Sequence, residues 1–524
     1  MGCPAFSCRC LTLGSARNSV SSQETLVQLT PSTRTERRMG DTELSYYLPA
    51  RESGVNDMYL HLSCRAPPHI LECERLRLVW AILRIRHPLM ASTIEMFTYD
   101  DIRFVYVSPH SAENALDDAG NNLEYRVQTK DELIDSYLNG PRLLSDDRIS
   151  YLIVSFPHET HSSIETLKCE FLISAAHFLG DGMALHQFAN EFFGLLGSSS
   201  TSQLSRLLSS EWYELCGKLA LKPRDLPSAL ESRLPPVHSK FSQIVARADF
   251  ERNQRKLIGG QTFPRVAKST RRTVVPTVSF DENRTKNILT RCKDHGVSIS
   301  SALVKSPRCQ RMNLAIANLL PILMMFIYRL MYSALNLRPY LLDNALNDSY
   351  WFLAIGYFNV ILPSFLPRSG ELCRTFWHRA HLAKIQSTDA VKNPLIVSRS
   401  REMARERGRK ARAWAKDDDD KANGIWKAPP VALKKSGPPS SALIGLSLLG
   451  NLDGIYKHSS FHEIKLDTLT TGSRQRAGGM LLFGYTFLAK LWISFGYDEN
   501  GFDEGIVERF WSNVISCTNE FLVN

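Results

Sequence analysis

One histidine stands where its side chain could carry protons. His177 follows an apolar run at residues 171–176, and Asp181 and Gly182 follow it four and five residues later. Of the fourteen histidines, only His177 has an aspartate at this spacing. Because imidazole titrates near neutrality, a histidine held at the end of a strand can act as a general base. The alternative is a packed histidine, with Asp181 only capping the helix that follows.

The neighbouring segments predict how this histidine is held. Residues 171–176 form a short apolar run that is typical of a buried strand. Beyond Gly182, apolar side chains recur at the spacing of one helical face, namely Leu185, Phe188, Ala189, Phe192 and Leu196. We therefore expect a strand, a tight connection and an amphipathic helix, with His177 in the connection.

This His-x-x-x-Asp-Gly pattern resembles the signature of the chloramphenicol-acetyltransferase-like superfamily. That superfamily includes peptide-synthetase condensation domains, plant acyl-CoA-dependent acyltransferases and fungal trichothecene O-acetyltransferases. The resemblance implies an α/β fold of two lobes, each a mixed sheet with helices, around a central active-site channel. It implies that His177 is the catalytic base and that Asp181 and Gly182 shape the loop. The Asp-Phe-Gly-Trp-Gly motif of the plant branch is absent, which disfavours that branch. Within the superfamily the sequence resembles the stand-alone fungal O-acetyltransferases most.

Two further stretches resemble parts of these enzymes. Residues 76–83 predict an amphipathic helix that ends before Pro88, and the resemblance makes Arg86 a candidate partner of the motif aspartate. An arginine placed only by the negative end of the helix is an equally open interpretation. Residues 274–303 resemble the start of the second lobe, with Asp281 opening a helix and Gly296 ending it. The helix expected next departs from the pattern, because it contains Pro307 and Pro321.

Three polar residues are candidates for contact with substrate. Asn336 and Arg338 follow an expected strand and could line the donor or acceptor channel. Ser447 lies in the apolar run 441–451 and could donate a hydrogen bond to an oxyanion. The alternative for all three is an ordinary polar residue satisfied at a strand edge.

The length of 524 residues exceeds one ordinary core and favours two lobes. Residues 1–38 are rich in Ser, Thr and Arg, which predicts a disordered extension or a mis-assigned start. We expect a first lobe at 39–220, an irregular crossover at 221–274 and a second lobe at 275–524. A serine-rich loop is expected at 198–210. Residues 398–440 are basic, then acidic, then proline-rich, and predict a solvated surface insertion.

Composition limits the remaining classes of function. The net charge of +10 is compatible with an anionic ligand such as coenzyme A, but no arginine–aromatic stripe indicates nucleic-acid binding. No Cys-x-x-Cys pair is present, so neither a structural zinc site nor a thioredoxin-like centre is expected. The eleven cysteines are odd in number and scattered, which favours reduced thiols over a disulfide framework. The apolar run 314–328 is shorter than a membrane span. We expect a cytoplasmic monomer with no membrane partner.

The resemblance implies an acyl-CoA-dependent O-acyltransferase, most simply an acetyltransferase, that acts on a hydroxyl of a small secondary metabolite. Acyl-CoA would be a co-substrate, and no bound cofactor is expected. Two alternatives stay open. A condensation-type enzyme would use carrier-bound thioesters, but such domains usually carry a second histidine where this chain has Ala176, and no carrier module is present. A non-catalytic binding protein of the same fold is the other alternative.

Overall fold

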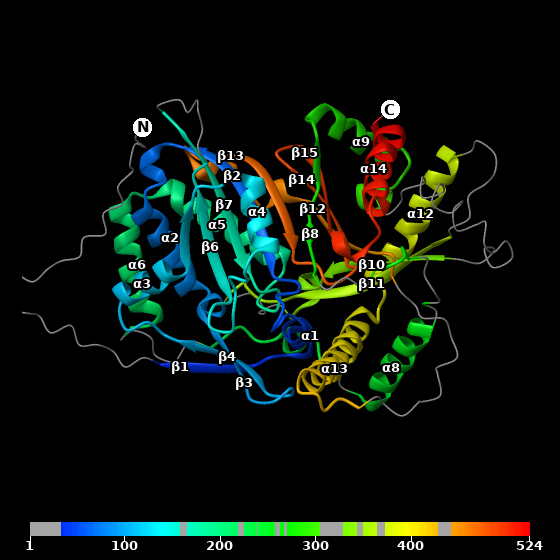
Figure 1. Cartoon of the computed structure of the whole chain (residues 1–524), viewed down its shortest axis with the longest axis horizontal. Coiled ribbons are helices and arrows are strands. Elements are labelled where there is room, and N and C mark those ends of the chain that lie inside the picture. The colour runs from blue at the N-terminus through cyan, green and yellow to red at the C-terminus, as the bar shows by residue number, and fades with distance from the viewer. Residues whose placement is uncertain are drawn as a thin grey trace, which may run out of the picture.

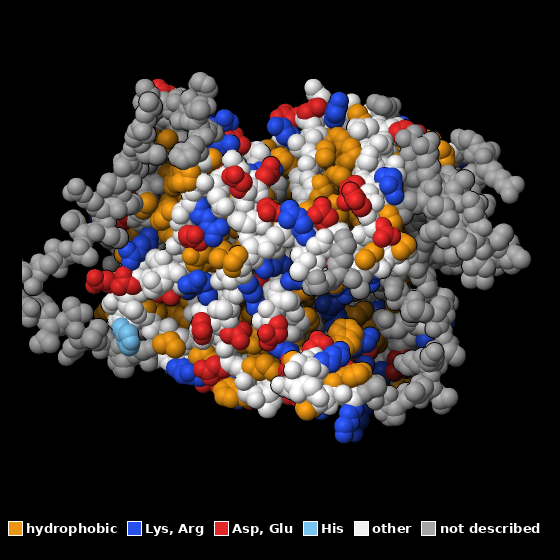
Figure 2. All heavy atoms as spheres, viewed as in Figure 1, with side chains coloured by type: hydrophobic (Ala, Val, Ile, Leu, Met, Phe, Trp, Pro, Cys, Tyr) orange, Lys and Arg blue, Asp and Glu red, His pale blue; other side chains and the backbone are white. Residues whose placement is uncertain are grey.

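Two mixed β-sheets, each covered by helices, form the two lobes of the protein (Figure 1). Figure 2 shows the surface indented between the lobes at the top of the same view. The expected α/β class with two lobes is confirmed. The computed structural model describes residues 33–157, 165–217, 225–237, 239–255, 257, 262–266, 270–303, 328–342, 349–363, 372–427 and 442–523.

The sheet of the first lobe has the strand order β13-β2-β7-β6-β5. Only β5 and β6 run parallel. Its strands are β2 (Met58–Ala66), β5 (Leu123–Arg126), β6 (Ser150–Ser155), β7 (Leu167–Ala175) and β13 (Lys465–Ser473). The expected division into 39–220 and 275–524 therefore needs correction, because β13 comes from the second half of the chain and completes the first sheet.

Five helices pack around this sheet. They are α2 (Cys73–Arg86), α3 (Ala112–Asn121), α4 (Lys130–Asn139), α5 (Gly182–Ser198) and α6 (Thr201–Leu215). The serine-rich loop expected at 198–210 is wrong, since most of it is α6, which packs against α2. The Ser200 hydroxyl accepts from the Gln203 amide at 3.3 Å, and the Gln203 side chain accepts from the Ser200 amide at 2.7 Å. This reciprocal cap starts the helix.

Helix α5 lies where the sequence predicts it, and all five residues of its predicted apolar face are buried. The ring of Phe171 on β7 lies 5.7 Å from Phe192 and 5.3 Å from Phe193, centroid to centroid. Burying each such side chain contributes about 1.5–3 kcal/mol. This packing fixes the strand and the helix on either side of His177.

The second sheet has the order β11-β10-β12-β14-β15-β8, and β9 also pairs with β15. Its strands are β8 (Thr273–Val274), β9 (Thr277–Phe280), β10 (Tyr328–Asn336), β11 (Ile355–Pro363), β12 (Ile444–Asn451), β14 (Met480–Phe487) and β15 (Lys490–Asp498). Its helices are α9 (Glu282–Asp294), α10 (Ile299–Leu303), α12 (Leu372–Val391) and α14 (Ile506–Thr518). Asp281 caps α9 and Gly296 follows its end with a positive φ, as expected. Pro307 and Pro321 lie outside the described residues.

The predicted solvated insertion is wrong over its first half. Residues 396–422 form the 27-residue helix α13 (Ile396–Ala422), which packs along α1 (Asp41–Ala50) of the first lobe (Figure 1). The side chains of α13 that are buried are mostly small, namely Ile396, Ser400, Ala404, Gly408, Ala411 and Ala415. Small residues at this spacing let two helix backbones approach closely. Helix α8 (Lys240–Arg255) lies within the crossover expected to be irregular and packs on α13, and α7 (Leu230–Arg233) precedes it.

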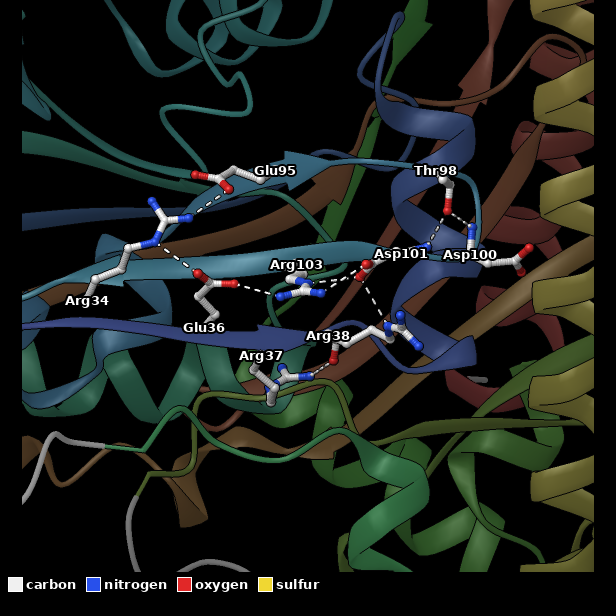
Figure 3. Close-up of polar contacts among 9 residues, drawn as sticks. All are labelled: Arg34, Glu36, Arg37, Arg38, Glu95, Thr98, Asp100, Asp101 and Arg103. Carbon is white, nitrogen blue, oxygen red and sulfur yellow. Dashed lines mark hydrogen bonds and ion pairs between the residues drawn. The ribbon is translucent and has the colours of Figure 1, made fainter.

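A separate three-stranded sheet contains β1 (Arg34–Arg38), β4 (Ile102–Val107) and β3 (Thr93–Met96), in that order. Arg34, Glu36, Arg103, Asp101 and Arg38 form a chain of ion pairs across it (Figure 3). Acidic and basic side chains are interspersed over these strands in Figure 2. The expected disordered extension to residue 38 is therefore too long, because residues 34–38 are a paired strand. Residues 1–32 lie outside the described part of the chain.

Short helical turns complete the described chain. The 3₁₀ turns are η1 (Pro68–Ile70), η2 (Pro88–Ala91), η5 (Arg338–Tyr340), η6 (Leu452–Gly454), η7 (His458–Phe461) and η8 (Glu499–Gly501), and Asn519–Val523 forms a π-helical turn. None of the helices in the described residues combines the length and apolarity that crossing a membrane requires.

Candidate active site

His177 lies in the connection between β7 and α5, at the junction of the two lobes. Its Nδ1 is 3.0 Å from the carbonyl oxygen of Gly180. A carbonyl can only accept, so Nδ1 carries the proton and Nε2 keeps a free lone pair. Among the described residues no hydrogen bond engages Nε2. The loop thus selects the tautomer in which the outward nitrogen can take a proton.

Tyr46 of α1 sets the plane of the imidazole. The two rings stack with centroids 4.2 Å apart and planes 28° apart. Burial lowers the pKa of His177 below its ordinary value; the charge of Arg407 lowers it further, and that of Asp181 opposes both. His177 is therefore neutral, and able to act as a base, at physiological pH.

Asp181 joins the two lobes beside this histidine. Its Oδ1 accepts from the amides of Met183 and Ala184 at 3.1 and 3.2 Å, which caps α5. Both carboxylate oxygens also lie 2.9 Å from Nη1 of Arg338, and Oδ2 accepts from the Ala354 amide at 2.8 Å. The capping role and the ion-pair role expected for Asp181 therefore occur together.

The partner of Asp181 is Arg338, not Arg86 as the resemblance suggested. Arg86 pairs with Glu191 of α5 and with Glu211 of α6, whose Oε1 is 2.5 Å from its Nη2. Glu191 also accepts from the Tyr350 hydroxyl at 2.5 Å and lies 3.2 Å from Nε2 of His87. The sequence made Arg338 one candidate for the lining of the channel, beside the alternative of a satisfied polar residue. Nη2 of Arg338 donates to the Phe352 carbonyl at 3.0 Å, so this residue clamps the loop.

Residues 349–354 of the second lobe insert into the core of the first. Trp351, Phe352, Leu353 and Ala354 are all buried there. The indole Nε1 of Trp351 lies 3.5 Å from the place a Cβ on Gly180 would occupy. The Phe352 ring contacts two guanidinium groups, with its centroid 4.1 Å from that of Arg233 and 5.1 Å from that of Arg338. This segment supports the His177 loop from behind.

The second lobe also contacts the start of α5 through β12. A Cβ on Gly182 would lie 3.3 Å from Cδ2 of Leu449, and the φ of Gly182 is not positive. Glycine is therefore needed at position 182 because β12 approaches closely, rather than because the chain turns there, as the sequence suggested.

Ser447 and Asn336 differ in position. Leu446 and Leu448 pack against the core of the second lobe, so the half-buried Ser447 between them lies on the opposite face of β12. Its predicted oxyanion role stays a prediction. Asn336 is exposed at the end of β10, and its Oδ1 accepts from the Arg338 amide at 3.1 Å. This contact matches the alternative of a polar residue satisfied at a strand end.

Sequence reasoning missed four residues that form one connected group with His177, namely Tyr46, Tyr357, Arg407 and Tyr332. The hydroxyls of Tyr46 and Tyr357 on β11 hydrogen-bond each other. The guanidinium carbon of Arg407 on α13 lies 4.5 Å from the ring centroid of Tyr357 and 5.4 Å from that of Tyr46. Tyr332 on β10 lies 6.0 Å from Tyr357, ring to ring. The small-residue spacing of α13 was the one signal that could have placed Arg407 on a packed helix.

In the part of the chain that the structure describes, no group of three or more His, Cys, Asp or Glu side chains could hold a metal ion. The chemistry that the arrangement supports on its own is proton transfer. A fixed neutral imidazole has a free Nε2, and phenol hydroxyls and one guanidinium lie nearby.

No protein-family model and no curated protein matches this sequence. Similar solved structures exist. TRI3 trichothecene 15-O-acetyltransferase from Fusarium sporotrichioides matches with a TM-score of 0.68 at 13% identity, over 94% of this chain and 95% of that chain. The first condensation domain of the CDA synthetase matches at 0.54 and 9% identity, over 94% and 97%. The condensation domain of Monacolin K polyketide synthase MokA matches at 0.53 and 11%, over 94% and 98%.

These similarities define the class of structure. The protein has the fold shared by chloramphenicol-acetyltransferase-like acyltransferases and condensation domains, as the His177 motif predicted.

Proposed function

We propose that the protein is an acyltransferase that moves an acyl group from a coenzyme A thioester to a hydroxyl of a small acceptor. The observation that carries this proposal is the state of His177. Its Nδ1 is committed to the Gly180 carbonyl, which leaves Nε2 free at the junction of the lobes. A positioned base of lowered pKa suits removal of a proton from an alcohol.

The reaction follows from this geometry. Nε2 of His177 takes the hydroxyl proton as the acceptor oxygen attacks the thioester carbonyl carbon. The carbonyl π electrons move to oxygen, and hydrogen-bond donors stabilise the resulting oxyanion; Ser447 is our candidate. The intermediate collapses, the carbon–sulfur bond breaks, and the imidazolium gives its proton to the leaving thiolate. No acyl-enzyme forms, because donor and acceptor meet at one base.

The donor in this proposal is free acyl-CoA, most simply acetyl-CoA, and the protein needs no resident cofactor. Support comes from Ala176, which stands where condensation domains usually carry a second histidine. A neighbour in fold is an O-acetyltransferase, which supports an alcohol acceptor of metabolite size. The second candidate is a condensation-type enzyme that accepts carrier-bound thioesters, since several condensation domains share the fold.

One assay separates these candidates. The full chain is incubated with a hydroxylated metabolite extract and either radiolabelled acetyl-CoA or the acetyl group on a carrier protein, at equal concentration. We expect label in a small product from acetyl-CoA with wild type, and roughly 10²- to 10⁴-fold slower labelling with His177→Gln. Label from the carrier-bound donor alone would establish the condensation-type reaction instead. Failure with both donors would favour a non-catalytic binding protein.

A further inference from the structure

Arg407 differs from the other arginines of α13 in having neither a carboxylate nor a carbonyl as a hydrogen-bond partner among the described residues. The helix carries six arginines, and five of them have a carboxylate or a carbonyl as partner. These are Arg399 with Asp249, Arg401 with the Leu234 carbonyl, Arg405 with Glu402, Arg409 with Glu406, and Arg412 with Asp41 and Asp100. Among the described residues, the one hydrogen bond of Arg407 runs from Nε to the Ser45 hydroxyl at 3.4 Å.

Aromatic contacts hold this guanidinium in place without using its hydrogen-bond donors. The rings of Tyr357 and Tyr46 lie 4.5 and 5.4 Å from its central carbon. Such contacts attract the cation through the ring faces. The helix itself is seated tightly, because a Cβ on Gly408 would lie 2.6 Å from Oδ1 of Asp41. Arg407 is therefore a positioned cation, and its Nη donors have no partner among the described residues.

This cation is close to the base. The Tyr46 ring that it contacts is the ring that stacks on His177 at 4.2 Å. A second arginine adds to the positive charge of the region. Burial raises the pKa of Tyr332, and the charges of Arg476 and Arg407 oppose that rise. Arg476 is exposed and has no carboxylate partner among the described residues. The charges of Arg476 and Arg407 therefore both act on Tyr332.

We propose that Arg407 binds a carboxylate on the acceptor molecule and so directs the acceptor hydroxyl toward Nε2 of His177. This inference rests on the proposed acyl transfer. A guanidinium edge matches a planar carboxylate with two parallel hydrogen bonds, which favours this anion. The phosphates of coenzyme A lie at the far end of the pantetheine arm from the thioester. The anion that meets Arg407 near His177 therefore belongs to the acceptor.

Binding can be tested without turnover. The probes are 4-fluorobenzoate and 4-fluorobenzamide, which have nearly the same shape and differ in charge, titrated into the full chain by fluorine NMR. We expect wild type to prefer the benzoate, and Arg407→Gln to weaken its binding roughly tenfold while leaving the benzamide unchanged. Arg409→Gln is the matched control, since it removes an exposed positive charge two residues away and should bind as wild type does.

Two results would overturn the proposal: equal binding of the two probes by wild type, or a benzoate preference that survives in Arg407→Gln. Arg407→Lys keeps the positive charge but lacks the planar guanidinium edge, so its affinity for 4-fluorobenzoate should fall between those of wild type and Arg407→Gln. This second variant keeps the test valid if Arg407→Gln fails to fold. His177→Gln should keep the benzoate preference. Carboxylate binding without any acetyl transfer would therefore refute the proposed function but still support the anion site at Arg407.

Kinetics separate this role from stabilisation of the oxyanion. The acceptors are 4-(hydroxymethyl)benzoate and 4-(hydroxymethyl)benzamide, with acetyl-CoA as donor. A carboxylate anchor predicts that Arg407→Gln raises the KM of the benzoate roughly tenfold and spares the benzamide. An equal loss of kcat for both acceptors, with KM unchanged, would mean that Arg407 acts on the transition state and would refute the proposal.

Discussion

Arg338 and Asp181, 157 residues apart in the chain, form an ion pair that ties the second lobe to the loop of His177. Their side chains are only 9% and 7% exposed. A buried pair of this kind is a weak source of net stability, because both charges give up water to form it. Its effect is positional: each partner is costly to remove alone, so the loop stays in one arrangement.

Arg338→Met should destabilise the protein strongly. The variant leaves the carboxylate of Asp181 buried without its cation, which costs about 3–5 kcal/mol. Asp181→Asn combined with Arg338→Met should cost less than the sum of the single changes, because the pair is removed together. Urea unfolding of the four proteins measures this coupling. Arg272→Met is the control, since that arginine is 49% exposed in its pairs with Asp135 and Glu499 and should change stability by less than about 1 kcal/mol. If the effects of Asp181→Asn and Arg338→Met on the free energy of unfolding simply add, the two side chains do not act as a coupled ion pair.

The rate should depend on a base with a low pKa. Because burial and Arg407 lower the pKa of His177, kcat/KM should stay high as the pH falls and decline only below the ordinary histidine value of about 6.5. Arg407→Gln removes one of the two causes that lower the pKa of His177. In this variant the decline of kcat/KM on the acid side should therefore occur at a higher pH than in wild type. His177→Gln should reduce turnover by roughly 10²- to 10⁴-fold with unchanged circular dichroism. A folded His177→Gln protein with normal turnover would exclude His177 as the base.

The start of the ordered chain can be located by truncation. A protein that begins at Met39 loses β1 and with it Arg37, which holds Glu43 at 2.8 Å. The Glu43 side chain is only 2% exposed, so losing this cation should cost about 3 kcal/mol or more. We expect the chain that begins at Met39 to melt well below one that begins at Thr33, and Arg37→Met in the longer chain to reproduce most of the loss. Identical melting of the two truncations would contradict a structural role for β1.

His186 should make stability depend on pH. Burial lowers its pKa to about 3, and its Nδ1 lies 2.9 Å from the Tyr456 hydroxyl. The unfolded chain binds a proton at this histidine below about pH 6.5, whereas the folded protein does not until about pH 3. This group therefore lowers the free energy of unfolding as the pH falls between these values, by about 1.4 kcal/mol per pH unit.

The check is urea unfolding from pH 6 to pH 4. The glutamine in His186→Gln does not titrate. The difference in free energy of unfolding between wild type and this variant should therefore become smaller as the pH falls. His69→Gln, at a side chain 58% exposed, is the control and should show the same pH dependence as wild type. If the difference in free energy of unfolding between wild type and His186→Gln stays constant over this range, His186 does not titrate as its burial implies.

Local patterns in the sequence predicted the elements that carry His177. The apolar run before His177, the helical spacing after Gly182 and the cap at Asp181 each depend on residues a few positions apart. The strand, loop and helix therefore formed where expected, and so did the helix that Asp281 opens. The two-lobe fold followed from the short motif around His177, because that motif resembles a known superfamily.

The contacts between distant segments were decided by the tertiary structure. Arg338 took the role expected of Arg86, and β13 crossed into the first sheet. A charge-rich stretch expected to be solvated became α13 and placed Arg407 against Tyr46, the ring that stacks on His177. An ion pair or a strand pairing forms between whichever complementary groups the packed chain brings together. Sequence spacing determined the local elements around His177 and the position of its side chain between them, whereas the partners of that histidine emerged only when the lobes packed.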